Sequence, residues 1–518
     1  MAAAVVALTA SAAPTEAFCG FYVSGSGGKM FNDATQVVLM RQGTRTVLAM
    51  QNDFKGPLED FAMVIPVPVV LKEGDVKTLP KHVFDHVDSL GSPRLVEYWE
   101  QDPCPAPADN RVAYRGRMPS KPSMSRSSDD APMKKPATVK VEAQFDVAEY
   151  KIVILSSTDS TGLETWLQDN GYKIPAGAEP LLRPYVESGS KFFVAKVDPK
   201  KVKLEPDTGP NQVGSANRRA ALSPIRFHYD SEEFALPIRL GMANSAGKQD
   251  LIVNVLSADK RYEVANYKNV FIPTNFDVTN AVKSRFGEFY VSLFDKTMEA
   301  NPGAVVTEYA WTAKPQYHCD PCPELDVTQA DLMTLGGDLV GGKIAQGTFV
   351  LTRLHARYGK SDMKDDLRFR EAKPVTGGRE EWSKAGLEYG AKPSTENYFQ
   401  ARYAVRHWWT GAINCKNPHR GVWGGPPDDV EYPSTIAASK VAFAPRKNFP
   451  LANHIGRDLW EIGFKKVKPA APVKPAPSIT TPPGGAGKGV KAPAMMGLGF
   501  LAGFTLLGLG SAARKRKR

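Results

Sequence analysis

Two short-spaced pairs of residues have the types that redox or metal chemistry requires. Cys319 and Cys322 form a C-x-x-C, a spacing found in thiol–disulfide oxidoreductases and in half of a zinc site. The adjacent Pro323 favours a turn where a redox pair needs the start of a helix, and no second C-x-x-C supplies further zinc ligands. His82 and His86 lie one helical turn apart, but no third ligand is identifiable. We therefore predict no metal and no cofactor.

Catalytic motifs with a defined mechanism are missing from the sequence. It contains no G-x-S-x-G nucleophile elbow and no H-E-x-x-H zinc helix. The segment from Gly337 to Lys343 approaches a phosphate-binding loop, but Ile344 stands where Ser or Thr would hold magnesium. A glycine-rich turn before a strand explains that segment better. We predict no catalytic residue from these patterns.

Unusual residues are densest between positions 406 and 427. Trp408, Trp409 and Trp423 lie there in a Gly/Pro-rich stretch that also contains Cys415. Such aromatics can form a platform for sugar rings or for a partner protein. They can equally close the end of a β core, with the cysteine fastening the loop. Both interpretations stay open, and the three tryptophans are the candidate recognition surface.

Cysteine usage bears on the cellular compartment. The chain has five cysteines, Cys19, Cys104, Cys319, Cys322 and Cys415. In an oxidising compartment the expected use is structural disulfides with one thiol left over. The pairing cannot be deduced from the sequence, and redox or zinc roles for the C-x-x-C remain alternatives.

The end of the chain resembles a membrane anchor. Residues 494–513 are 20 consecutive uncharged residues, and a helix of about 20 apolar residues matches the thickness of a bilayer. The basic tail that follows, Arg514, Lys515, Arg516, Lys517 and Arg518, favours the cytoplasmic side. We predict a transmembrane helix with the body outside the cytoplasm. A cleaved sorting signal is the alternative.

The beginning of the chain is consistent with export. Residues 2–13 are small and apolar, and Thr15-Glu16-Ala17 resembles a signal-peptidase site, although no Lys or Arg precedes the apolar run. We predict a signal peptide over residues 1–17. The location that follows is the bacterial cell envelope, with either membrane allowed.

Charge is distributed unevenly along the chain. The formal net charge is +11, but 11 Lys and Arg with no acidic residue lie from Lys465 onward. The preceding 464 residues therefore hold 55 basic and 55 acidic residues and are neutral. The overall positive charge is therefore no evidence that residues 1–464 bind nucleic acid.

Apolar patterns predict an α+β, β-rich fold in two possibly related lobes, residues 18–222 and 223–464, followed by a Pro/Gly-rich stalk over 465–493. A disordered loop is predicted within the first lobe at 103–138. Glu97-Tyr98-Trp99 recurs as Glu308-Tyr309-Ala310-Trp311, each downstream of a predicted helix, which suggests the relation between the lobes.

Individual elements follow from residue spacing. Predicted strands are 36–39, 46–51, 61–70, 150–156, 191–197, 225–229, 236–244, 251–257 and 348–354. Predicted helices are 162–170, 179–187, 277–299 and 328–335. The helix over 277–299 has an apolar stripe that we assign to the core.

Four segments resemble the domain-of-unknown-function 2330 family. They are Ala17-Phe18-Cys19-Gly20-Phe21-Tyr22-Val23, the 166–175 segment WLQDNGYKIP, the 354–358 segment LHARY and the 423–426 segment WGGP. The resemblance covers roughly residues 18–430. It implies an exported bacterial protein and supplies no activity and no catalytic residue.

We predict an exported, membrane-tethered envelope protein with a structural or recognition role. Its expected partners are the membrane and either an envelope protein or a cell-wall glycan. An envelope enzyme, a hydrolase or a thiol oxidoreductase, is the alternative, and a released protein with a cleaved tail is a further one.

Overall fold

The computed structural model has a β-rich body with a small number of helices. It describes residues 21–24, 31–55, 61–104, 139–171, 178–206, 218–244, 248–314, 326–359, 363–379, 382–383, 386–387, 389–426, 441–444 and 446–466. Over these residues the predicted α+β, β-rich class is confirmed.

Several sequence predictions fall outside that part of the chain. They are the signal peptide over 1–17, Cys19, Cys319, Cys322, residues 105–138 of the predicted loop, the stalk beyond 466, the helix over 494–513 and the tail from Arg514 to Arg518. Among the described residues, no helix has both the length and the apolar character that a membrane span requires.

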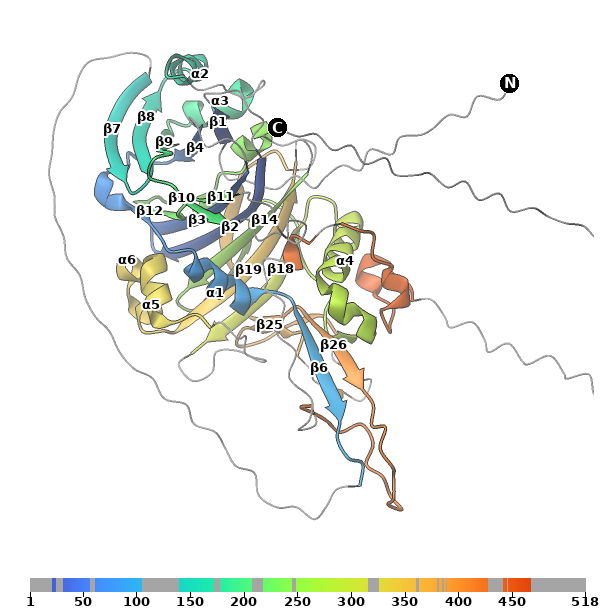
Figure 1. The fold of residues 1–518 in the computed structure, drawn as a ribbon. Helices are drawn as coiled ribbons and strands as arrows, with labels where there is room; N and C mark the ends of the chain where they lie inside the picture. The colour runs from blue at the N-terminus through green and yellow to red at the C-terminus, as the bar shows by residue number, and fades with distance from the viewer. Residues whose placement is uncertain are drawn as a thin grey trace, which may run out of the picture. The chain divides into compact units, whose positions relative to one another are not determined.

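An eleven-stranded mixed sheet forms the centre of the body (Figure 1). In order its strands are β24 (Ala391–Pro393), β21 (Val375–Gly377), β25 (Tyr398–Gln400), β18 (Val305–Ala313), β19 (Phe349–Tyr358), β14 (Gln249–Ser257), β2 (Phe31–Gln42), β3 (Arg45–Lys55), β12 (Ile225–Asp230) and β5 (Val76–Thr78), with β16 (Asn269–Phe271) beside β18. Every residue of β14 is buried, including the polar Gln249, Asp250 and Asn254.

A five-stranded sheet packs on one face of the central sheet. Its strands are β1 (Phe21–Ser24), β4 (Phe61–Val67), β9 (Lys191–Val197), β8 (Tyr150–Ser157) and β7 (Val139–Val147). The rings of Phe193 in β9 and Phe227 in β12 lie 5.4 Å apart within the shared apolar core. Helices α2 (Ser160–Asp169) and α3 (Glu179–Glu187) contribute to a second core on the outer side of this sheet.

Helices contribute to the cores on the other face of the central sheet. They are α1 (His82–Gly91), α4 (Phe286–Ala300), α5 (Gln329–Leu332), α6 (Asp338–Val340) and α7 (Gly342–Ala345). The predicted apolar stripe, from Val278 through Phe289 to Phe294, is buried in the core, and from Phe286 onward it belongs to α4. Figure 1 shows α1 and α4 against β18 and β19.

Shorter elements complete the body. The strands are β10 (Lys203–Pro206), β11 (Arg218–Ala221), β13 (Ala235–Leu236), β15 (Arg261–Val264), β20 (Leu367–Ala372), β22 (Trp382–Ser383) and β23 (Gly386–Leu387). The 3-10 helices are Glu73–Asp75, Arg239–Asn244, Asn280–Arg285, Leu451–Asn453 and Trp460–Ile462, and a π-helical turn spans Met333–Gly337.

The predicted elements agree with the structure in part. The helix over 179–187 and the strand over 191–197 are confirmed at both ends. The strand over 236–244 is wrong, because Pro237 has no N–H for a ladder and a 3-10 helix follows from Arg239. The helix over 277–299 begins too early, because Asp277 belongs to a strand and α4 starts at Phe286.

The two predicted lobes are not separate sheets. Strands β2 and β3 of the first sequence half pair with β14 and β12 of the second half within the central sheet. The two copies of the internal repeat are each a helix followed by a strand, α1 with β6 (Arg94–Glu100) and α4 with β18. These strands belong to different sheets.

Candidate functional site

A four-stranded sheet positions the tryptophans singled out from the sequence. Its order is β17 (Phe276–Asp277), β26 (Arg402–His407), β6 and β27 (Trp423–Gly424). Strand β26 runs parallel to β6, and β27 runs antiparallel to β6. Figure 1 shows β6 and β26 side by side, leading to the loops at their ends. We call residues 408–426 the tip.

A disulfide fastens the tip to the end of β6. Cys104 and Cys415 are bonded, with their Cα atoms 5.6 Å apart and a separation of 311 positions in the chain. The backbone N–H of His419 also donates to the carbonyl of Pro103. Residues 410–422 are mostly exposed, so they have few core contacts of their own. A cross-link is what holds such a segment in place.

Glu100, the last residue of β6, is the second anchor of the tip. Its carboxylate accepts two 2.7 Å hydrogen bonds from the guanidinium of Arg420. It also accepts from the backbone N–H groups of Gly421, at 2.8 Å, and Trp409, at 3.0 Å. The hydrogen bonds from Arg420, with those from the two N–H groups, lower the pKa of Glu100 to about 2.

An open recess of about 280 Å³ lies on the tip. It is lined by Asp277, Arg406, Trp408, Gly421 and Trp423. The two indole rings meet edge to face with centroids 4.9 Å apart, and Trp408 is 60% exposed. Arg406 donates to Asp277 at 2.7 Å and lies over the ring of Trp423 at 4.7 Å.

Two of the three candidate tryptophans lie at the recess, and the third does not. Trp408 and Trp423 meet at the recess, as a shared recognition surface requires. Trp409 instead packs over Gly411, where an added Cβ would come within 2.6 Å of its ring. The predicted fastening of the loop by Cys415 is also observed. Asp277 and Glu100 were missed, because they lie more than 100 positions from the residues they bind.

The histidine pair does not form a metal site in the described part of the chain. His86 bonds Asp331 at 2.9 Å, and the same carboxylate accepts from the backbone and hydroxyl of Thr328 as a helix cap. His82 lies 3.9 Å from Asp331. The pair therefore supports the start of α5.

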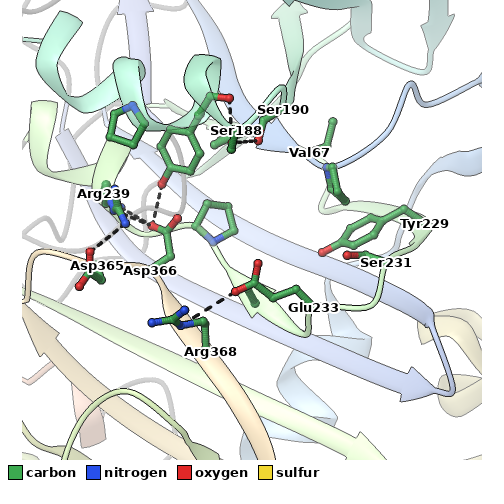
Figure 2. A pocket seen from close by; sticks show the side chains of 16 residues that line it. Val67, Ser188, Ser190, Tyr229, Ser231, Glu233, Arg239, Asp365, Asp366 and Arg368 are labelled. Atoms are coloured by element: carbon green, nitrogen blue, oxygen red, sulfur yellow. Dashed lines mark hydrogen bonds and ion pairs between the residues drawn. The ribbon is translucent and has the colours of Figure 1, made fainter.

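A second cavity, of about 400 Å³, lies beside α3 and β20. Figure 2 shows two separate sets of charged contacts, Arg239 with Asp365 and Asp366, and Arg368 with Glu233. Asp366 accepts from the hydroxyl of Tyr185 at 2.6 Å and from the backbone N–H of Ile238 at 2.9 Å. Arg239 donates to Asp365, and Arg368 lies 3.9 Å from Glu233. These interactions hold α3 against β20 and leave the charges of the cavity paired.

Buried ionisable groups lie between β19 and the helices. Glu308 is the extra residue of a β-bulge in β18, and such a bulge re-aims a side chain. Its carboxylate accepts from Arg353 at 2.7 Å, from His355 at 2.6 Å and from the hydroxyl of Tyr290. Burial raises the pKa of Glu308, but His355 and Arg353 outweigh it and lower that pKa to about 2.

The same cluster extends along β19. Arg353 also bonds Asp88 of α1, and Arg357 joins Asp250 and Asp295, each at 2.6 Å. Burial lowers the pKa of His355, but Glu308 and Asp250 outweigh it and raise that pKa. We call these groups, together with Arg446 on Asp250, the core ion cluster. Its four carboxylates face three arginines and His355.

One comparison with known proteins gives a match. The model of a bacterial family described as "Uncharacterized protein conserved in bacteria (DUF2330)" matches residues 13–370. The core ion cluster lies within that span except for Arg446, whereas the tip lies beyond it. No curated protein and no solved structure gives a significant match to this chain.

Proposed function

The chain belongs to the DUF2330 family of uncharacterised bacterial proteins, and we propose that it is an exported envelope protein that binds carbohydrate at its tip. The observation that carries the proposal is the recess, in which an exposed indole stands beside a carboxylate and a guanidinium. Because the family match ends before the tip, the proposal concerns this chain.

A sugar ring is complementary to the recess. Its C–H face is apolar and can lie on the exposed ring of Trp408, while its hydroxyl groups both donate and accept hydrogen bonds. Asp277 can accept from such hydroxyls and Arg406 can donate to them. The backbone of Gly421 lines the same recess with φ of 78°, a left-handed conformation that favours glycine.

Export and tethering are part of the proposal. The Cys104–Cys415 disulfide suits an oxidising compartment, and the apolar segments near both ends of the chain suit passage to the envelope and attachment there. Cell fractionation with mass measurement of the mature ends tests this. An intact Arg518 in a membrane fraction supports an anchor. Loss of residues 494–518 supports a released protein, and a cytoplasmic, disulfide-free chain overturns export.

Carbohydrate binding is tested with the full chain in its oxidised form. A glycan array identifies ligands, and calorimetric titration then compares the wild type with Trp408→Ala and Trp423→Ala. We expect each variant to bind at least about tenfold more weakly. Removal of a central aromatic side chain from a binding site typically costs about 2 kcal/mol of binding free energy. If the wild-type protein binds no glycan on the array, the proposal is wrong.

Trp460→Ala is the matched control for these variants. Trp460 is even more exposed, at 76%, but it stacks on Tyr389 and does not line the recess. Its replacement should leave the affinity unchanged. Equal losses in all three variants would mean that the site is elsewhere. Binding of a protein by the tip, with no glycan bound, would favour a protein partner instead.

A further inference from the structure

Three arginines and a tyrosine share one face of the four-stranded sheet. In the parallel pairing of β6 with β26, Arg402 lies opposite Arg94, and Arg406 lies opposite Tyr98. The two positions on each strand are four residues apart, an even spacing, so their side chains lie on the same face. The guanidinium of Arg402 is 5.5 Å from the centre of the Tyr98 ring, and that of Arg406 is 5.7 Å from it. Arg406 also lines the recess.

Two of these arginines donate hydrogen bonds to acceptors near the sheet. Arg94 donates to the carbonyls of Ser89 and Leu90 at the end of α1, where a cation is favourable. Arg406 donates to the carboxylate of Asp277. The other carboxylate of this region, Glu100, is engaged by Arg420 and the tip backbone.

Arg402 has no such partner within the part of the chain that the structure describes. Only 6% of the residue is exposed, and its Nε makes no hydrogen bond there. The hydroxyl of Tyr98 is likewise buried without a partner among those residues. Burial, followed by the positive charges of Arg94 and Arg406, lowers the pKa of Arg402 to about 10. Among the described residues, no carboxylate therefore pairs with the positive charge of Arg402.

Building on the proposed carbohydrate function, we propose that the ligand of the tip is an acidic saccharide, with a carboxylate or a phosphate on the ring that enters the recess. The exposed indole contacts the sugar ring, and the anionic substituent lies toward Arg406. The charge of Arg402, which shares the Tyr98 ring with Arg406, strengthens this preference. A neutral sugar would make the same ring contact without that gain.

Pairs of saccharides that share the same sugar ring but differ in charge test the effect of the ligand's charge separately from that of its ring. Trigalacturonic acid and its methyl ester have the same rings, and glucose 6-phosphate is compared with glucose. Calorimetric titration of the full oxidised chain at low ionic strength should show roughly tenfold tighter binding of one charged member than of its neutral counterpart. That preference should decline with added salt. The member that binds distinguishes carboxylate from phosphate.

Variants locate the source of the preference. Arg402→Met should reduce the charged-over-neutral ratio several-fold, whereas Arg402→Lys should retain most of it. Arg368→Met, in the second cavity, is the control that leaves the ratio unchanged. Equal affinity of the wild type for charged and neutral members overturns the inference and keeps the carbohydrate proposal. Retention of the full ratio in Arg402→Met also overturns it, and binding of no saccharide overturns both proposals.

Discussion

Arg353 and Arg402 are both buried strand arginines, but their surroundings differ. Arg353 lies in the core ion cluster between Asp88 and Glu308, and both carboxylates bind its guanidinium. Arg402 lies on the four-stranded sheet against an aromatic ring and two like charges. A buried charge lowers stability unless it is paired with an opposite charge. Of the two, only Arg353 has such pairing with carboxylates among the described residues. The surroundings of Arg402 leave its guanidinium without a carboxylate partner there.

The comparison separates a structural role from a recognition role. In the core ion cluster, carboxylates face cations, and Arg353, Asp88 and Glu308 are buried. Near the tip, the exposed indole of Trp408 lies at the recess, and Arg402 on the adjoining sheet has no carboxylate partner among the described residues. A concentration of ionisable residues is therefore not sufficient evidence for a site. Accessibility and charge balance decide between the two roles.

The largest expected effect comes from Arg353→Met. Its removal leaves Asp88 and Glu308 buried without their common cation, and breaking a buried pair costs about 3–5 kcal/mol. Urea denaturation of the full chain, followed by circular dichroism, measures the loss in free energy of unfolding. A loss below about 1 kcal/mol would contradict the structural role of this cluster.

Removal of the tip disulfide should have the next largest effect. Cys104→Ala with Cys415→Ala is expected to cost about 2–4 kcal/mol, as for other native disulfides. Hydrogen exchange should rise in residues 408–422, while exchange in β14 and β19 stays low. The same variant should bind saccharide weakly because Trp408 loses its fixed position. Unchanged exchange at the tip would mean that Glu100 alone holds the loop.

The core ion cluster should lose stability as the pH rises. The pKa of His355 is above its ordinary value of 6.5, so the folded protein holds this proton more tightly than the unfolded chain. The resulting stabilisation is complete below about pH 6.5 and declines as the pH rises through the folded-state pKa. His355→Asn should flatten this dependence of the unfolding free energy. His82→Asn, at an exposed histidine, should not.

The tip should respond in the opposite direction. Because the pKa of Glu100 falls from 4.5 to about 2 on folding, its stabilisation is present above about pH 4.5 and disappears as the pH falls toward 2. The protection of the Trp409 and Gly421 amides, relative to the intrinsic exchange rate at each pH, should therefore fall in acid. Glu100→Gln should show the lowered protection already at neutral pH. Glu179→Gln, on α3, is the control expected to leave the tip unaffected.

The smallest stability effect is expected for Arg402→Met. Methionine keeps the apolar contact with Tyr98 and removes a buried charge that has no carboxylate partner, so the unfolding free energy should change by less than about 1 kcal/mol. Urea denaturation beside Arg353→Met makes the comparison direct. A loss as large as that of Arg353→Met would show that Arg402 has an essential structural partner.

Local sequence patterns predicted much of the secondary structure and part of the site. The helix at 179–187 and the apolar stripe of α4 follow from spacing along one helix. The density of tryptophans around Cys415 indicated the tip. Strands β6 and β26 were not predicted. Charged and aromatic residues in these strands do not alternate regularly with apolar ones. Some charged residues on each strand are buried, so the usual polar-out, apolar-in pattern is absent.

By itself the sequence determined the charge neutrality of the body, the candidate anchoring segments and the aromatic density of the tip, because these depend on residue types alone. Only the tertiary structure decided which cysteine pairs with Cys104, that Glu100 holds Arg420 across 320 positions and that Trp409 turns away from Trp408. It also decided that Arg353 is balanced and Arg402 is not. Pairing between distant residues depends on sheet register, which no local pattern contains.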